Sequence, residues 1–154
     1  MTYDYSVENL WKVVSSPNYL NNVHPFCKEN SIIKWNNDHH EDKILYLNNK
    51  TYIRKFVSWK ALKGYDLWIG DNNKDQSFVE WRLEKAGNRS KLTITVYPFL
   101  LSNWPRILSF LPYFLYINIK LKSYLFSVLS GIDWYIKENT PVPKNQFGKH
   151  SWFS

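Results

Sequence analysis

Histidine is the residue type best suited to proton transfer near neutral pH, and this sequence contains four. Two of them, His39 and His40, are adjacent in the run DHHED at residues 38–42, which has the residue types of a metal site. A metal ion needs three or four ligands that converge on one point, whereas adjacent side chains on an extended loop diverge. We therefore predict a solvated turn here, a structural or exposed His150, and no metal or cofactor.

His24 is the best candidate for a catalytic residue. It lies in the run HPFC at residues 24–27, between an expected small helix and a strand, and its ordinary pKa would suit a general base. The sequence shows no obligatory partner for it, so a packed or capping histidine is the interpretation that we favour. A nucleophile elbow, a glycine-rich phosphate loop, an HExxH motif and a paired-cysteine motif are all missing from the sequence.

Arg54, in the run TYIRKFVSW, shares strand parity with Tyr52 and Phe56. If that parity faces inward, Arg54 would be a cation in an apolar site and a natural anchor for a carboxylate or phosphate. The opposite arrangement would pack Ile53 and Val57 inside and turn Arg54 outward. We favour the outward arrangement, although the sequence leaves both open.

Hydrophobic spacing indicates the elements that must position these side chains. After a very short extended start, Ser6 is a plausible N-cap for a helix over residues 7–15, whose apolar residues fall on one face. Six runs rich in β-branched and aromatic residues predict strands over 27–35, 43–49, 51–60, 64–71, 76–86 and 90–99. Short connections favour an antiparallel meander. From Leu121 onward, apolar steps of four and three predict a long C-terminal helix.

The segment Phe99 to Ile119 contains a single charge, Arg106, and is nearly long enough to cross a bilayer. Pro105 and Pro112 interrupt it, and a central arginine costs about 2.5–3.5 kcal/mol on insertion scales. We therefore expect no transmembrane span. The segment is instead predicted to be a kinked, mostly helical stretch, either packed on the core or covering a cavity mouth. Contact with lipid is a third alternative.

Composition favours one globular domain. Aromatic residues make up 18% of the 154 residues, so a wide apolar space must be filled or lined. The net charge is +7, but no short window is dominated by Lys or Arg, so we expect no nucleic-acid partner. A single cysteine, Cys27, rules out an intrachain disulfide, and the start lacks the pattern of a secretory signal. These features fit a cytoplasmic protein.

Several local strings resemble the SRPBCC superfamily, which includes START-like and birch-pollen-allergen-like proteins and the polyketide cyclase/dehydrase group. They are SVENLWKVVSSPNYLNNVHPF near the start, LTITVYP before the last helix and YLFSVLSGIDWYI within it. The resemblance implies an α+β helix-grip fold, in which a bent antiparallel sheet wraps around a long C-terminal helix and leaves a hydrophobic tunnel. It also implies binding of a lipid, polyketide or similar ligand.

We therefore expect a helix-grip domain over residues 1–138 and a tail over 139–154 that packs on it or extends from it. The expected function is binding of a small hydrophobic or amphipathic ligand. A cyclase- or dehydratase-type enzyme and a membrane-surface or protein-interaction module using residues 99–119 are the alternatives; the oligomeric state is left open. The candidate ligand-binding residues are Tyr46, Arg54, Leu67, Trp81, Leu83, Tyr97, Phe110 and Tyr124.

Overall fold

Short connections between consecutive strands give a seven-stranded antiparallel sheet, as the sequence predicts. The computed structural model describes residues 1–71, 76–99 and 112–154. The strands are β1 (Thr2–Tyr3), β2 (Cys27–Trp35), β3 (His40–Tyr46), β4 (Thr51–Lys60), β5 (Gly64–Gly70), β6 (Gln76–Ala86) and β7 (Arg89–Tyr97). Their order in the sheet is β1-β7-β6-β5-β4-β3-β2, so each strand from β2 to β7 pairs with its neighbour in the sequence.

The cross-strand register brings the inward-facing side chains of the central strands together. Leu67 on β5 lies opposite Val79 on β6, which lies opposite Val96 on β7. Because successive side chains of a strand point to opposite faces, these residues form one row on the inner face of the sheet. A neighbouring row contains Tyr65 and Trp81.

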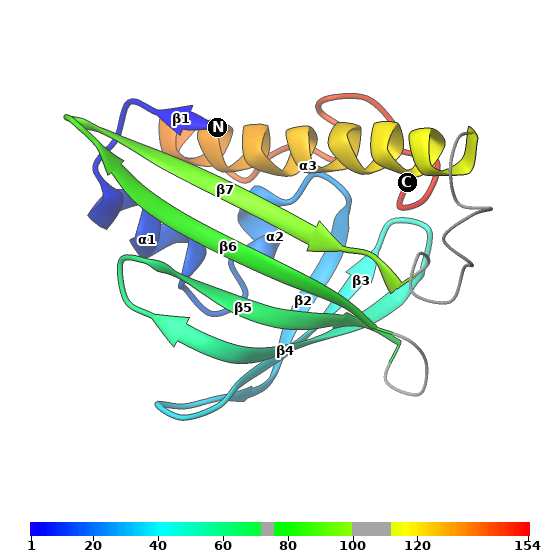
Figure 1. The fold of residues 1–154 in the computed structure, drawn as a ribbon, viewed down its shortest axis with the longest axis horizontal. Coiled ribbons are helices and arrows are strands. Elements are labelled where there is room, and N and C mark those ends of the chain that lie inside the picture. Colours follow the sequence, from blue (N-terminus) through cyan, green and yellow to red (C-terminus); the bar gives the residue numbers. More distant parts are fainter. Residues whose placement is uncertain (72–75, 100–111) are drawn as a thin grey trace.

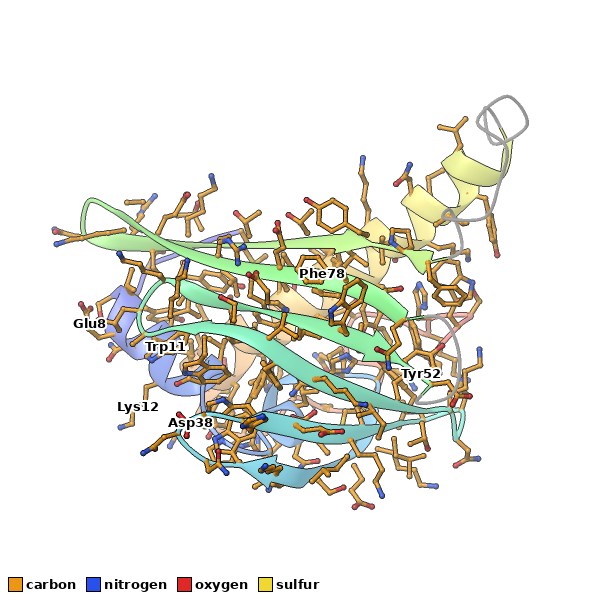
Figure 2. The ribbon with its side chains drawn as sticks, turned by 60° about the horizontal axis from the view of Figure 1, so that its bottom comes forward. Glu8, Trp11, Lys12, Asp38, Tyr52 and Phe78 are labelled. Atoms are coloured by element: carbon orange, nitrogen blue, oxygen red, sulfur yellow. The ribbon has the colours of Figure 1, made fainter. Side chains whose placement is uncertain are left out.

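The first helix, α1 (Val7–Val14), begins where the sequence predicts. The backbone N–H of Asn9 donates to the Ser6 hydroxyl oxygen at 3.2 Å, which confirms Ser6 as the N-cap. Figure 2 shows Trp11 directed toward the strands, while Glu8 and Lys12 lie on the outer side of the helix. The α1 helix therefore closes one end of the sheet with its apolar face.

A second, short helix, α2 (Leu20–Val23), contacts the edge strand β2 through Asn21. The side-chain amide of Asn21 donates to the carbonyl of Asn30 at 2.9 Å and accepts from the N–H of Asn30 at 2.7 Å. One side chain thus forms both hydrogen bonds that an adjacent strand would form with this residue.

The long helix α3 (Pro112–Glu138) runs along the open side of the bent sheet (Figure 1). Its Val128 and Ile132 are buried in the core. Gly131 allows α2 to approach closely, because a Cβ at this position would lie 2.0 Å from the Val23 carbonyl oxygen. This arrangement confirms the predicted helix-grip fold.

The predicted kinked helical stretch over residues 99–119 is described only in part. Residues 100–111 lie outside the described ranges, whereas Pro112 occupies the first turn of α3, where its missing N–H costs little. Within the described ranges, none of the helices has both the length and the hydropathy required to cross a membrane.

The C-terminal residues after α3 fold back against the domain. The N–H of Val142 donates to the carbonyl of Asn22 at 2.8 Å, and a ring nitrogen of the buried His150 lies 3.0 Å from the carbonyl oxygen of Lys120. The C-terminus consequently lies near the early turns of α3 (Figure 1). This return places the last aromatic residues of the chain beside the inner face of the sheet.

Candidate functional site

A cavity of about 660 Å³ lies between the inner face of the sheet, α2, α3 and the C-terminal segment. Its described apolar lining includes Leu20, Ile44, Leu67, Val79, Trp81 and Val128. His24, Tyr46, Arg54 and Tyr124 also line it. Lys50 and Thr51, which are exposed, mark the rim, and Phe153 and Trp152 of the C-terminal segment form part of the wall.

Three polar side chains from three different elements meet in the cavity wall. His24 follows the end of α2, Tyr124 comes from α3, and Tyr46 ends β3. The Nε2 atom of His24 lies 2.8 Å from the Tyr124 hydroxyl oxygen, which lies 3.3 Å from the Tyr46 hydroxyl oxygen. We call these residues the His24–Tyr124–Tyr46 chain.

The hydrogen-bond partners of His24 determine where its proton lies. The backbone N–H of Phe26 donates to Nδ1 of His24 at 3.2 Å, so Nδ1 must carry a lone pair. Burial lowers the pKa of His24 from 6.5 to about 3, and the ring is therefore neutral near pH 7 with its proton on Nε2. Nε2–H then donates to the Tyr124 hydroxyl oxygen, and either hydroxyl can be the donor in the hydrogen bond between Tyr124 and Tyr46.

A buried ion pair lies beside this chain. Arg54 donates from Nε to one carboxylate oxygen of Asp42 at 2.7 Å and from Nη2 to the other. Its Nη1 donates to the Tyr19 hydroxyl at 3.0 Å, and the Tyr19 and Tyr65 hydroxyl oxygens are 2.8 Å apart. Arg54 and Asp42 are almost fully buried, so the charge of Arg54 is neutralised within the protein.

The outward orientation that we favoured for Arg54 is wrong. Arg54 is only 3% exposed, whereas Val57 is 58% exposed. Arg54 lies opposite Asp42 on β3 and Ile69 on β5, and all three face inward. The buried carboxylate determines this parity, because it supplies the partner that a buried guanidinium requires.

Other predicted site residues are divided between the cavity and the rest of the molecule. Leu67 and Trp81 line the cavity, as do Tyr46, Arg54 and Tyr124. Leu83 is buried in the core but is not part of the described lining. Whether the lining residues bind a ligand stays a prediction.

Two predicted positions do not contribute to the described cavity. Tyr97 is 53% exposed and contacts Phe78 on the outer face, because it has the opposite parity to the inward-facing Val96. Its expected place in the cavity is therefore wrong. Phe110 lies outside the described residues.

The run at residues 38–42 is a solvated turn only in part. His40 and Asp42 belong to β3, where His40 stacks on Trp59 with ring centroids 4.1 Å apart and Asp42 is fully buried. Sequence reasoning missed Asp42 as the buried partner of Arg54 in the candidate site, since it resembled one more polar turn residue. In the part of the chain that the structure describes, no three His, Cys, Asp or Glu side chains are placed to hold a metal ion.

Three titratable residues of the cavity wall, His24, Tyr46 and Tyr124, have pKa values far from neutrality. The pKa of His24 is about 3, and burial raises the pKa values of Tyr46 and Tyr124. General acid–base catalysis is most efficient when the catalytic pKa is near the working pH. These three side chains are therefore better suited to hydrogen bonding than to proton transfer near neutral pH.

Comparison with solved structures shows the same fold in several proteins. The chain is similar to Ara h 8.0201, with a TM-score of 0.66, 20% identity and coverage of 90% of this chain and 95% of the other. A START superfamily protein from Mycobacterium smegmatis matches with a TM-score of 0.56 and 11% identity, covering 91% and 95% of the two chains.

A third similar structure is the di-domain ARO/CYC StfQ from the steffimycin biosynthetic pathway. It matches with a TM-score of 0.61 and 6% identity over 90% of this chain and 44% of StfQ. These similarities establish the helix-grip fold that the sequence resemblance implied. No protein-family model matches the sequence, and no curated protein matches it either.

Proposed function

We propose that this protein binds a small hydrophobic or amphipathic ligand in its internal cavity. The observation that carries the proposal is the 660 Å³ cavity itself, which is lined mainly by apolar side chains and has a few polar groups gathered in its wall. Ligand pockets typically have volumes of about 300–1,000 Å³ and are likewise lined mostly by apolar side chains with a few polar groups. Each 100 Å² of apolar ligand surface buried here would contribute about 2.5 kcal/mol before the costs of association.

An uncharged apolar dye such as N-phenyl-1-naphthylamine tests the proposal, because its fluorescence rises in apolar surroundings. Two variants on β7 form a matched pair: Val96→Trp fills the cavity from the inner face, and Thr95→Trp adds the same side chain at the adjacent position of opposite parity. We expect saturable binding by the wild type and by Thr95→Trp, and at least about tenfold weaker binding by Val96→Trp. Equal dye binding by all three folded proteins, or none by the wild type, would contradict the proposal.

Native mass spectrometry provides an independent measurement. A ligand held in the cavity during purification would add a discrete mass to the wild-type protein and would be lost from Val96→Trp. Thermal denaturation of each variant would show whether the protein is folded, so that loss of ligand is not confused with loss of structure.

A second candidate function is contact with an anionic membrane surface through α3. Leu115, Ile119 and Phe126 are each more than half exposed on this helix, and Lys122 lies among them. The net charge of +7 would favour an anionic surface. Sedimentation with phosphatidylserine vesicles tests this candidate; we expect Ile119→Ser to reduce binding, and binding that is unaffected by Ile119→Ser would contradict it.

A further inference from the structure

Residues 150–154, which we call the C-terminal turn, form one part of the cavity wall. Phe153 lines the cavity and stacks on Tyr46 with ring centroids 4.4 Å apart, and Trp152 also belongs to the lining. Phe153 packs against Tyr124 of α3 as well, with ring centroids 4.7 Å apart. Movement of this turn would therefore open the cavity without a change in the sheet.

The C-terminal turn is attached to the domain separately from the residues that precede it. Upstream, the N–H of Asn145 donates to the carbonyl of Pro25 at 3.0 Å. Gly148, which is exposed, follows with a φ of 97°. Beyond this glycine, the side chain of Asn48 donates to the carbonyl of Trp152 at 2.6 Å. The turn can therefore be released while the attachment at Asn145 is kept.

His150 organises the C-terminal turn, and backbone partners fix the position of its proton. Its Nε2 lies 3.0 Å from the carbonyl oxygen of Lys120, which can only accept, so Nε2 carries the proton. The backbone N–H of Trp152 donates to Nδ1 at 3.4 Å, so Nδ1 carries a lone pair. The N–H of His150 donates to the Ser154 hydroxyl at 2.7 Å, and that hydroxyl donates to the Asn145 side chain at 2.6 Å. The two ring hydrogen bonds together require a neutral imidazole.

The groups packed against the buried His150 ring oppose a second proton. Phe26 contacts the ring from the connection between α2 and β2, Tyr124 contacts it from α3, and Phe153 stacks on it from the turn itself. Burial lowers the pKa of His150, and the hydrogen bond to the Lys120 carbonyl offsets this effect only in part. The nearby Lys120 ammonium lowers the pKa further.

Other charged groups border the turn. Lys144 and Lys149 of the C-terminal segment and Lys50 at the rim are exposed cations, and the carboxylate of Ser154 is an anion. Ammonium and terminal carboxylate groups ordinarily stay charged between about pH 5 and 7, whereas histidine ordinarily titrates there. The pKa of the neighbouring His24 is about 3. Titration of His150 is therefore the change that this pH range brings to the turn.

We propose that the C-terminal turn is a pH-controlled gate of the cavity, closed near neutral pH and opened in mildly acidic solution when Nδ1 of His150 accepts a proton. This inference rests on the proposed function and adds how ligand entry is regulated. The second proton faces the Trp152 N–H, so the closed form loses that hydrogen bond. A released turn instead exposes the imidazolium to water. Release removes Phe153 from the wall, and a ligand passes there.

Proton linkage sets the largest possible effect. A histidine that titrates near pH 6.5 in the open form and stays neutral in the closed form would raise the open fraction at most about 25-fold between about pH 7 and pH 5. While the open fraction is small, the rate constant for ligand association rises in the same proportion.

Stopped-flow association of N-phenyl-1-naphthylamine at about pH 7 and pH 5 tests the gate. We expect the wild type to bind the dye at least about threefold faster at the lower pH, within the 25-fold limit. His150→Gln keeps an amide that can donate to Lys120 but cannot titrate, so its rate should be the same at both pH values. His39→Gln is the matched control, since it removes an exposed histidine and should keep the wild-type increase.

A wild-type rate that is equal at both pH values would overturn the inference while leaving the proposed function intact. The same would follow from an equal increase in His150→Gln or from loss of the increase in His39→Gln. Failure of the dye to bind at either pH would overturn the proposed function itself. Should His150→Gln not fold, an NMR titration of the wild type decides. We expect the His150 ring and the amides of Trp152 and Phe153 to shift together with one midpoint below pH 6.5, and a ring that titrates while both amides stay unmoved would overturn the gate.

Discussion

Because His24 is buried in its neutral form, we predict that the stability of this protein falls as the pH is lowered below about 6.5. Burial lowers its pKa in the folded protein from 6.5 to about 3. Between these values the unfolded chain binds a proton that the folded protein does not, so this contribution to stability is present above about pH 6.5 and is lost as the pH falls toward 3. One pH unit corresponds to about 1.4 kcal/mol, and lowering the pH from about 7 to about 5 should therefore remove about 2 kcal/mol.

Urea denaturation of the wild type and His24→Gln at both pH values measures this loss. Burial also lowers the pKa values of His40 and His150, which contribute in the same direction, but they are present in both proteins. The difference between the two pH dependences therefore isolates His24. An equal loss of stability in both proteins would refute the reasoning. Should His24→Gln not fold, an NMR titration of the wild type decides instead, and ring resonances of His24 that titrate near pH 6.5 would refute it.

Three further predictions concern packing and access. Asp42→Ala leaves the buried Arg54 unpaired and should lower the free energy of unfolding by about 3–5 kcal/mol in urea denaturation; a loss below about 1 kcal/mol would show that water reaches the guanidinium. Gly131→Ala places a methyl group against the Val23 carbonyl and should lower the melting temperature, so an unchanged value would contradict the close approach of α2 and α3. Phe153→Ala should speed dye association in stopped-flow measurements, because this ring forms part of the cavity wall, and unchanged rates would place ligand entry elsewhere.

The sequence predicted the elements well because their signals are local. The bounds of β2, β4 and β6 were predicted to the residue, and the Ser6 N-cap was confirmed by its hydrogen bond. Alternating β-branched residues, turn residues and capping residues act over a few positions. Such signals can be read without knowing which segments meet in space.

The candidate site was less predictable because its contacts join distant parts of the sequence. His24 and Tyr124 are 100 positions apart, and their hydrogen bond depends on how α2 packs against α3. The orientation of Arg54 depends on the burial of Asp42, 12 positions earlier on the adjacent strand. Both faces of β4 carry large apolar residues, so the alternation within that strand could not decide between them.

The contribution of the C-terminal segment to the cavity was also missed. Residues 139–154 have no hydrophobic periodicity, and we predicted only that they pack on the domain or extend from it. Phe153 stacks on Tyr46 with ring centroids 4.4 Å apart, and Asn48 donates to the carbonyl of Trp152 at 2.6 Å. Isolated aromatic residues in such a segment were the available signal, but they do not indicate which surface they contact.

The pairing of Asn21 with the backbone of Asn30 has a consequence for self-association. β2 is an edge strand, and Ile32 and Ile33 are both exposed on it, a combination that favours strand-to-strand aggregation. Asn21 forms hydrogen bonds with both backbone groups of Asn30, and Lys144 donates to the carbonyl of Cys27. These backbone groups in the first half of the edge strand therefore already have hydrogen-bond partners. A register irregularity between Ile32 and Lys34 distorts the second half. A concentrated solution of this protein should therefore resist the edge-to-edge addition that leads to fibrils, and a leucine in place of Asn21 should remove part of that resistance.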